Sequence, residues 1–325
     1  MRIRWGILST GRIAGIFARD LALVPDAELV AVGSRAQASA DGFAERYGVP
    51  RSYGSYEALA ADPDVDVIYV ATPHVLHAAN SLLCLRAGKA VLCEKPFTVN
   101  AAEARAVVGT AREQGLFLME AMWTRFLPLF VHLREIIAGG VIGAVRMLDV
   151  DFGFRATYDS QHRLFNWELA GGTLLDIGVY AISLASMLFG APRRAIGLAR
   201  LGETGVDEQA GIVLEHDNGA FAVIATSFRV STPIEARLYG TEGRITVHPR
   251  WYRSTRMTLY VEGQEEQVIE MPVEGSGYQY EAAEVGRCLR QGLQESPVMP
   301  LDETVRIMET LDSLREPWGL RYPGE

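Results

Sequence analysis

Short apolar segments alternate with helical segments through the first third of the chain, and this alternation constrains its fold more than any other feature. Residues 3–8 form an apolar run, and residues 13–23 follow with the apolar spacing of a helix. The pattern repeats, predicting strands at 29–33, 66–71, 91–93 and 116–119 and helices at 37–47, 77–87 and 101–114. Such alternation indicates βαβ units and a parallel sheet covered on both faces. Because these crossovers are nearly always right-handed, we expect a doubly wound sheet.

The pattern changes after about residue 122, where strands follow one another across turns such as Asp217-Asn218-Gly219. The predicted strands are 145–154, 195–200, 208–214, 220–228, 234–239, 243–247 and 257–261, and the predicted helices are 173–189, 280–291 and 301–315. Short turns between strands indicate a mostly antiparallel sheet. The sequence therefore predicts an α/β protein with a dinucleotide-binding Rossmann domain over residues 1–121. An α+β domain with a large, mostly antiparallel sheet is expected over residues 122–325.

The composition is that of a soluble globular protein, with 49% hydrophobic and 22% charged residues. The formal net charge of −9 argues against nucleic acid or an anionic membrane as the main partner. Cys84, Cys93 and Cys288 show no metal-ligand spacing, so we expect buried free thiols and no metal. No signal-peptide pattern precedes the first strand, and no apolar run approaches the roughly 20 residues of a membrane span. We therefore expect a cytoplasmic protein.

The turn between the first strand and the first helix has the features of a nucleotide-binding loop. Backbone N–H groups and the dipole of the helix can hold a pyrophosphate there. Leu8 replaces the middle glycine of the usual G-x-G-x-x-G pattern, so the turn alone could be purely structural. Its place in the first βα unit favours a nucleotide. The cofactor-binding residues predicted in this turn are Gly6, Leu8, Ser9, Thr10, Gly11, Arg12 and Ile13.

The end of the second predicted strand bears on which nicotinamide cofactor binds. A free ribose 2′-hydroxyl usually meets an Asp or Glu there, whereas a 2′-phosphate favours Arg. Here the strand leads into Ser34 and Arg35 with no acid. A guanidinium can pair bidentately with phosphate, and a serine can add a hydroxyl donor. We therefore expect NADP rather than NAD, the alternative being a solvated arginine.

Of the 31 basic residues, only Lys89 and Lys95 are lysine, so each is a candidate for a role that arginine cannot fill. Lys89 precedes a predicted strand and fits a surface residue. Lys95, in Glu94-Lys95-Pro96, follows the same strand and lies at the sheet edge where ligands bind. An ammonium there can hydrogen-bond a substrate hydroxyl or lower the pKa of a neighbouring phenol.

A glycine pair, Gly171-Gly172, marks the start of an apolar helix that carries Asp176 and Tyr180. These two residues are four apart and so project from one face. A tyrosine in this position can be purely structural, but with Lys95 the pair forms a possible proton relay. Tyr180 would take the hydroxyl proton of an alcohol, Lys95 would stabilise the phenolate, and Asp176 would orient the substrate or the lysine.

Other candidates follow the ends of predicted strands or lie near the domain junction. Of His74 and His77, we expect one to contact the nicotinamide or substrate and the other to begin a helix. Trp123 and Phe152 are predicted to line a substrate pocket, although aromatic residues are more often core. His162 and Trp167 lie in a polar loop that could be a lid. The further cofactor-binding residues predicted are Thr72, His74, His77, Glu94 and Lys95.

Three segments together resemble the glucose-fructose oxidoreductase/inositol dehydrogenase (GFO/IDH/MocA) family, in particular its dimeric dihydrodiol dehydrogenase and NADP-dependent D-xylose 1-dehydrogenase branch. They are residues 5–14, Glu94-Lys95-Pro96 and residues 175–180. The resemblance covers nearly the whole chain, and Leu8 is usual in this branch. It implies Lys95 and Tyr180 as the catalytic pair, with Asp176 in support. It also implies a homodimer or higher oligomer formed through the open face of the C-terminal sheet.

These observations predict an NADP-dependent oxidoreductase acting on a small sugar or cyclic diol. Hydride would pass to C4 of the nicotinamide from an aldose C1, such as that of D-xylose, or from a trans-dihydrodiol. Two alternatives remain: a sugar–sugar oxidoreductase that keeps NADP bound, and a non-catalytic NADP-sensing regulator. The residues do not identify the substrate.

Overall fold

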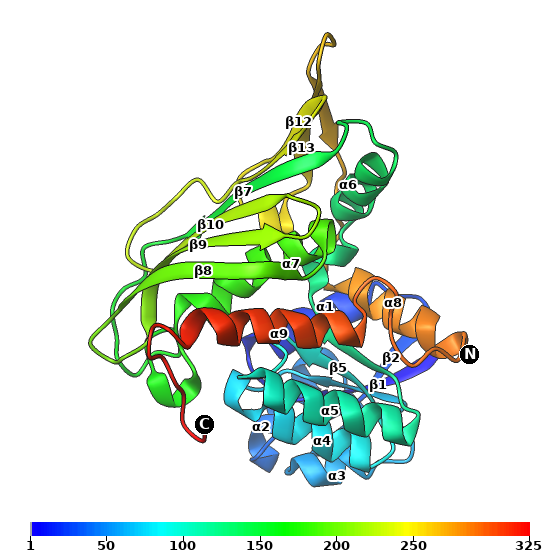
Figure 1. Cartoon of the computed structure of the whole chain (residues 1–325). Coiled ribbons are helices and arrows are strands. Elements are labelled where there is room, and N and C mark those ends of the chain that lie inside the picture. Colours follow the sequence, from blue (N-terminus) through cyan, green and yellow to red (C-terminus); the bar gives the residue numbers. More distant parts are fainter. Residues whose placement is uncertain (1) are drawn as a thin grey trace. The chain divides into compact units, whose positions relative to one another are not determined.

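The computed structural model describes residues 2–325, which divide into two compact units (Figure 1). The first unit contains the chain up to Phe126 and the segment Glu274–Val305. The second contains Leu127–Val273 and Arg306–Glu325. This division differs from the expected ranges 1–121 and 122–325, because the chain returns to the first unit after Val273. The returning segment carries α8 (Tyr278–Arg290), which packs against α1 (Arg12–Leu21).

Asp20, near the end of α1, ties the returning segment to the first unit. Its buried carboxylate accepts hydrogen bonds from the backbone N–H groups of Ser276 and Tyr278, each at 3.0 Å. Gly277 precedes α8 and supplies no side-chain cap. Asp20 therefore satisfies the N–H of Tyr278, the first residue of α8, where a negative charge also suits the helix dipole.

Six parallel strands form the sheet of the first unit, in the order β3-β2-β1-β4-β5-β6. They are β1 (Ile3–Leu8), β2 (Ala27–Gly33), β3 (Arg51–Tyr53), β4 (Val67–Val70), β5 (Ala90–Glu94) and β6 (Leu118–Ala121). The doubly wound parallel sheet is confirmed, and β3 is an addition to the predicted strands. The strand order reverses between β1 and β4, and ligands of such sheets bind outside the carboxyl ends of strands at this point.

Helices cover this sheet in two groups. Their bounds, besides α1 and α8, are α2 (Gln37–Tyr47), α3 (Tyr56–Ala60), α4 (His77–Arg86) and α5 (Ala101–Gln114). Helices α3, α4 and α5 contact one another in succession, whereas α1 contacts α2 and α8. The start of α5 is capped by two side chains: Asn100 accepts the Glu103 N–H at 2.9 Å, and Glu103 accepts the N–H of Val99, the residue before the cap, at 3.1 Å.

The second unit is built on an eight-stranded sheet in the order β14-β13-β12-β11-β7-β10-β9-β8. The strands are β7 (Val145–Gly153), β8 (Pro192–Leu201), β9 (Asp207–His216), β10 (Phe221–Ser227), β11 (Ala236–Gly240), β12 (Gly243–Val247), β13 (Arg256–Val261) and β14 (Gln267–Glu270). Strand β10 pairs with β7 in parallel, and the other neighbouring pairs within residues 127–273 are antiparallel. The mostly antiparallel sheet is therefore confirmed.

Three helices complete the structure: α6 (Pro128–Ala138), α7 (Val179–Phe189) and α9 (Leu301–Arg315), the last shared between the units. By length and composition, Trp167–Phe189 is long and apolar enough to cross a membrane, so the expectation that no apolar run is long enough was wrong. Most of this segment is buried within the second unit, where α7 contacts β7. A helix that is apolar on all sides is typical of a protein core as well as of a membrane span.

Candidate active site

The predicted nucleotide loop lies at the carboxyl end of β1. Gly6 and Leu8 are buried in the strand, where a Cβ on Gly6 would meet Leu59 and Val65 at 3.1 Å. Ser9 then adopts a φ of 112°, which is uncommon for a residue other than glycine. Conformations of this kind are frequent at functional sites.

The start of α1 fits the pyrophosphate of a dinucleotide. Gly11 precedes the helix in an extended conformation, with no side-chain cap and no acidic residue in the first turn, which begins with Arg12 and Ile13. A Cβ on Gly11 would meet only Ser9 Oγ within 4 Å, at 3.6 Å, so the loop is open to a ligand. Uncapped N–H groups at a helix start attract anions. The half-exposed Ser9 and Thr10 hydroxyls lie in the same loop.

Ser34 and Arg35 directly follow β2, as predicted. The Ser34 N–H donates to the carbonyl of Tyr53 at 3.0 Å, and Arg35 is exposed. Tyr56, at the start of α3, lies close to Arg35: burial raises the pKa of Tyr56, and the guanidinium partly opposes that shift. A guanidinium, a hydroxyl and a phenol therefore gather at the end of β2, a set that suits a phosphate.

Thr72, His74 and His77 follow the carboxyl end of β4. His77 is 0% exposed, and its two ring nitrogens each lie 2.8 Å from a carbonyl oxygen, Nδ1 from Pro96 and Nε2 from Thr72. Burial lowers the pKa of His77, against the effect of these carbonyls. His77 is thus the histidine that begins a helix, and its ring nitrogens are already used within the protein. His74 remains the histidine predicted to contact a ligand.

Glu94 and Lys95 lie at the end of β5, the edge predicted for them. The buried carboxylate of Glu94 accepts a hydrogen bond from the Tyr69 hydroxyl and another from the Lys95 backbone N–H at 3.2 Å. The Tyr69 ring stacks on Phe17, with ring centroids 3.8 Å apart. The side chain of Glu94 therefore holds the backbone of Lys95, whose own side chain is half-buried. The peptide bond between Lys95 and Pro96 is cis.

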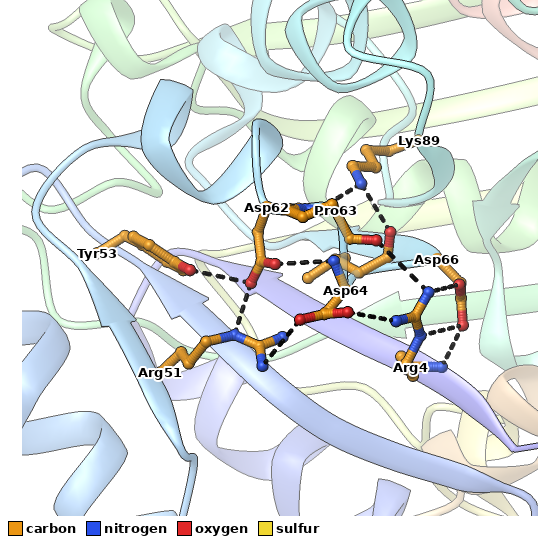
Figure 2. Close-up of polar contacts among 9 residues, drawn as sticks. Arg4, Arg51, Tyr53, Asp62, Pro63, Asp64, Asp66 and Lys89 are labelled. Atoms are coloured by element: carbon orange, nitrogen blue, oxygen red, sulfur yellow. Dashed lines mark hydrogen bonds and ion pairs between the residues drawn. The ribbon is translucent and has the colours of Figure 1, made fainter.

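Lys89 is not the surface residue that its position predicted. It is 8% exposed, and its Nζ donates to the carbonyl of Val65 at 2.8 Å and to that of Asp62. Figure 2 shows it within a polar network that includes the ion pair of Arg4 with Asp66 at 2.7 Å. These residues lie at the amino ends of the strands, opposite the edge where ligands bind. Lys89 is therefore a structural residue.

Trp123, predicted to line a substrate pocket, lies in a 3-10 turn after β6. Its buried ring stacks on Tyr278 of α8, with centroids 4.5 Å apart and planes 18° from parallel. Arg125 in the same turn is buried and pairs with Glu303 at 2.7 Å. Trp123 therefore contacts the segment that returns to the first unit.

In the second unit, the predicted glycine pair is required by close packing. A Cβ on Gly171 would lie 2.7 Å from the carbonyl oxygen of Leu164, and one on Gly172 would lie 2.1 Å from Asp207 Oδ1. The other carboxylate oxygen of Asp207 accepts the Thr173 hydroxyl at 2.6 Å and the Leu174 N–H at 2.7 Å. Burial raises the pKa of Asp207 to about 7. Asp207 thus fixes the start of the helix that carries Asp176 and Tyr180.

That helix begins differently from the prediction. Leu174–Gly178 is π-helical, and α7 begins at Val179. π-helical turns are frequent at functional sites. Asp176 and Tyr180 are 6% and 7% exposed, and Asp176 Oδ1 pairs with Arg163 at 2.8 Å. A cationic partner for Asp176 is thus supplied within the second unit.

Tyr180 belongs to an aromatic cluster. Phe152 of β7, predicted to line a pocket, has its ring centroid 6.0 Å from that of Tyr180. Tyr252, in the 3-10 turn Trp251–Arg253, stacks on Phe152 with centroids 4.5 Å apart and lies 5.6 Å from Tyr180. A stacked pair of aromatic rings therefore lies beside the phenol that is predicted to accept a proton.

The loop that precedes the glycine pair is tied to the end of the chain. The Trp167 indole N–H donates to the carbonyl of Arg321 at 2.6 Å, and the Tyr322 hydroxyl donates to that of Gly171 at 2.7 Å. His162 accepts the N–H of Leu164 within its own loop. Two contacts with the C-terminal segment thus hold the loop predicted to be a lid.

Cys84, Cys93 and Cys288 are buried free thiols, as predicted, and burial raises the pKa of each. Within residues 2–325, the structure places no group of three or more His, Cys, Asp or Glu side chains where it could hold a metal ion.

Arg163 and Tyr252 were missed by the sequence predictions. Arg163 lies eight residues before the glycine pair, but nothing distinguishes it there from the chain's many other arginines. Tyr252 is brought to Tyr180 only by the folding of the sheet. No local pattern marks either residue.

Comparisons with known proteins agree with these features. Residues 3–122 match the oxidoreductase family with an NAD-binding Rossmann fold, and residues 130–246 match the GFO/IDH/MocA C-terminal domain. The chain is 42% identical to the trans-1,2-dihydrobenzene-1,2-diol dehydrogenase of Mus musculus and 40% identical to that of Homo sapiens, each over 99% of both chains. The chain belongs to the GFO/IDH/MocA oxidoreductase family. The family resemblance seen in the sequence is confirmed, and with it the NAD(P)-binding character of the first unit.

Solved structures extend the comparison for this GFO/IDH/MocA protein. The 3-ketoreductase KijD10 from Actinomadura kijaniata, in complex with NADP and TDP-benzene, has a TM-score of 0.86 and 26% identity, covering 97% of this chain and 98% of its own. The aldose-aldose oxidoreductase from Caulobacter crescentus, complexed with glycerol, has a TM-score of 0.90 and 24% identity over 98% and 99% of the two chains. The likeness to the aldose-aldose oxidoreductase shows that the two proteins share a fold.

Proposed function

We propose that this protein is an NADP-dependent dehydrogenase that oxidises a hydroxyl-bearing carbon of a cyclic diol, with a trans-dihydrodiol as the first candidate and an aldose C1 as the second. The observation that carries the proposal is the environment of Tyr180. Its phenol lies beside the stacked rings of Phe152 and Tyr252 and one helical turn from the Asp176–Arg163 pair. The full-length similarity to dihydrodiol dehydrogenases supports it.

Oxidation of the substrate removes a proton from its hydroxyl group and a hydride from the adjacent carbon, leaving a carbonyl group. A bound nicotinamide supplies the hydride acceptor. In this proposal the Tyr180 phenolate takes the hydroxyl proton, and the ammonium of Lys95 supplies the positive charge that lowers the pKa of the phenol. Asp176, held by Arg163, accepts a hydrogen bond from a substrate hydroxyl and so orients it. The aromatic rings provide a flat apolar surface for an unsaturated ring.

The proposed preference for NADP rests on Arg35, Ser34 and Tyr56 at the end of β2. A guanidinium with neighbouring hydroxyl groups can bind a 2′-phosphate, and no acid follows β2 to bind a free 2′-hydroxyl. The complex of KijD10 with NADP is consistent with this preference. A cytoplasmic location remains a prediction.

We also propose a homodimer or higher homo-oligomer formed through the sheet of the second unit. Alternate residues of its neighbouring strands β8, β9 and β10 expose large apolar side chains, and contiguous surfaces of this kind are typical of interaction sites. They are Ile196, Leu198, Val213, Phe221 and Val223.

The test is to compare Lys95→Met and Tyr180→Phe with the wild type, following nicotinamide reduction with dihydrodiols, inositols and aldoses. We expect kcat to fall by about a hundredfold or more in each variant, because general acid–base catalysis contributes at least that much. NADP binding, measured by calorimetry, should persist. Tyr158→Phe, an exposed tyrosine of the second unit, is the control.

Full turnover by both variants would overturn the proposed mechanism. NADP that stays bound through gel filtration and turns over only with a second sugar would indicate a sugar–sugar oxidoreductase instead. Tight NADP binding without reduction by any substrate would indicate a regulator.

A further inference from the structure

The segment before β11 contains a residue in an unfavourable conformation. Ile234 has a φ of 60°, in the left-handed region that β-branched residues almost never adopt. Such conformations persist only where the surrounding structure holds them, and they cluster at functional sites. The contacts of Ile234 therefore show what holds it.

Asp151 of β7 is the residue that holds this segment. Its Oδ2 accepts the N–H of Ile234 at 2.6 Å, and its Oδ1 accepts the N–H of Glu235 at 3.3 Å. The backbone N–H of Asp151 also donates to the Glu235 carbonyl at 3.1 Å. Both carboxylate oxygens thus hold two successive backbone N–H groups.

Asp151 and Ile234 also hold Trp251, which is fully buried. The Trp251 backbone N–H donates to the carbonyl of Ile234 at 3.1 Å, and its indole N–H donates to the carbonyl of Asp151 at 3.0 Å. Asp151 and Ile234 therefore account for both N–H groups of Trp251. The next residue in the chain is Tyr252, whose ring contacts Phe152 and Tyr180.

We propose that Asp151 is a positioning residue for the reaction at Tyr180: its carboxylate holds Ile234 in the left-handed conformation, and Ile234 and Asp151 together hold Trp251 so that Tyr252 lies against Tyr180. This inference rests on the proposed function, because it takes Tyr180 as the proton acceptor. Phe152 follows Asp151 on β7. This strand therefore carries the Phe152 ring itself, and it positions the Tyr252 ring through the hydrogen bonds of Asp151.

Asp151→Asn is the informative variant, because the amide keeps the shape of the carboxylate but presents only one oxygen to the two N–H groups. We expect kcat/KM for a cyclic diol to fall by about ten- to a hundredfold, the scale of loss that small misplacements in a site cause. NADP binding should be unchanged, since the nucleotide loop lies in the first unit. Asp149→Asn is the matched control: Asp149 is on the same strand and face, and its carboxylate pairs with the half-exposed Arg237 at 3.4 Å.

Ile234→Gly provides a rescue, because glycine adopts a positive φ without the carboxylate. We expect Ile234→Gly alone to lose much less kcat/KM than Asp151→Asn, and the double variant Asp151→Asn/Ile234→Gly to recover most of the kcat/KM that Asp151→Asn loses. The near-UV circular dichroism signal, which reports the packing of aromatic side chains including Trp251, should fall in Asp151→Asn and return in the double variant.

Two results would overturn the inference: Asp151→Asn behaving like Asp149→Asn in both measurements, or a loss that Ile234→Gly does not rescue. If the wild type fails to reduce NADP with any of the dihydrodiols, inositols or aldoses tried, the proposed function fails. The dichroism series then still tests the link from Asp151 through Ile234 to Trp251.

Discussion

Lys89 and Lys95 lie at opposite ends of one strand. Lys95 follows the carboxyl end of β5, with its backbone held by Glu94, whereas Lys89 precedes the amino end and is buried. Donation from one Nζ to two carbonyl oxygens suits the compact ammonium, since a planar guanidinium carries its donors in a fixed fork. Of the two lysines, Lys95 thus has a proposed catalytic role and Lys89 a structural one.

Lys89→Met is expected to destabilise the protein without changing kcat. It leaves the buried carbonyls of Asp62 and Val65 without their shared donor, a loss of about 1–3 kcal/mol in the free energy of unfolding. Urea unfolding measures this loss. An unchanged midpoint with a lowered kcat would instead place Lys89 in the reaction.

Arg35→Ala is expected to weaken NADP binding while leaving NAD binding nearly unchanged. Loss of a hydrogen-bonded contact with a charged group costs about 1.5–3 kcal/mol, which corresponds to roughly a ten- to hundredfold rise in Kd. Calorimetric titration with each cofactor measures the difference. An equal loss for both cofactors would contradict a role for Arg35 at the 2′-phosphate.

The position of a residue relative to a strand could be predicted from sequence more readily than its exposure. The position of Lys95 at the sheet edge was predicted correctly, because the end of a buried parallel strand can be recognised in the sequence. The burial of Lys89 depends on carbonyls of residues 62 and 65, more than 20 positions away, which no local pattern indicates.

At the scale of elements, Asp207 links β9 to the helix that carries Asp176 and Tyr180. Burial raises its pKa to about 7, above the about 3.9 of an aspartate in an unfolded chain. Between these values the folded protein keeps a proton that the unfolded chain has released. The free energy of unfolding therefore falls as pH rises from about 4 to about 7.

Asp207→Asn should flatten this dependence, because an amide does not titrate. Urea unfolding of the wild type and the variant at several pH values across that window measures the two slopes. Glu120, whose pKa burial also raises to about 7, keeps its own contribution in both proteins. Identical slopes would show that Asp207 does not carry the proton.

Most elements could be predicted from periodicity, but not those whose form depends on distant packing. The short strand β3 and the outermost strand β14 are too brief to leave a clear pattern, and α6 was also missed. The apolar spacing of residues 173–189 predicts a helix, yet its first turn is π-helical. Likewise, no local sequence pattern indicates that Asp176 pairs with Arg163, which lies 13 residues earlier in a loop.

At the scale of the whole molecule, the apolar face of β8, β9 and β10 predicts self-association. Leu198, on the edge strand β8, is 82% exposed, and a charge there would be buried on pairing. Leu198→Glu should therefore shift sedimentation from oligomer to monomer, while Leu293→Glu, an exposed leucine of the first unit, should not. Identical sedimentation of the wild type and Leu198→Glu would argue against this face as the interface.

The division of the chain could be predicted only in part. The change of pattern near residue 122 lies close to the end of the first segment at Phe126. The return of residues 274–305 was missed, because the periodicity of α8 identifies a helix and not the unit against which it packs.

The hydrogen bonds between Asp20 and the start of α8 join parts of the chain that a ribosome makes at very different times. While residues 127–273 emerge, the nucleotide-binding sheet is already complete in strands but lacks the helix that packs on α1. The apolar face of α1 that α8 later covers stays open during that interval. We therefore expect nascent chains of this length to be more prone to aggregate until residues 274–305 are made.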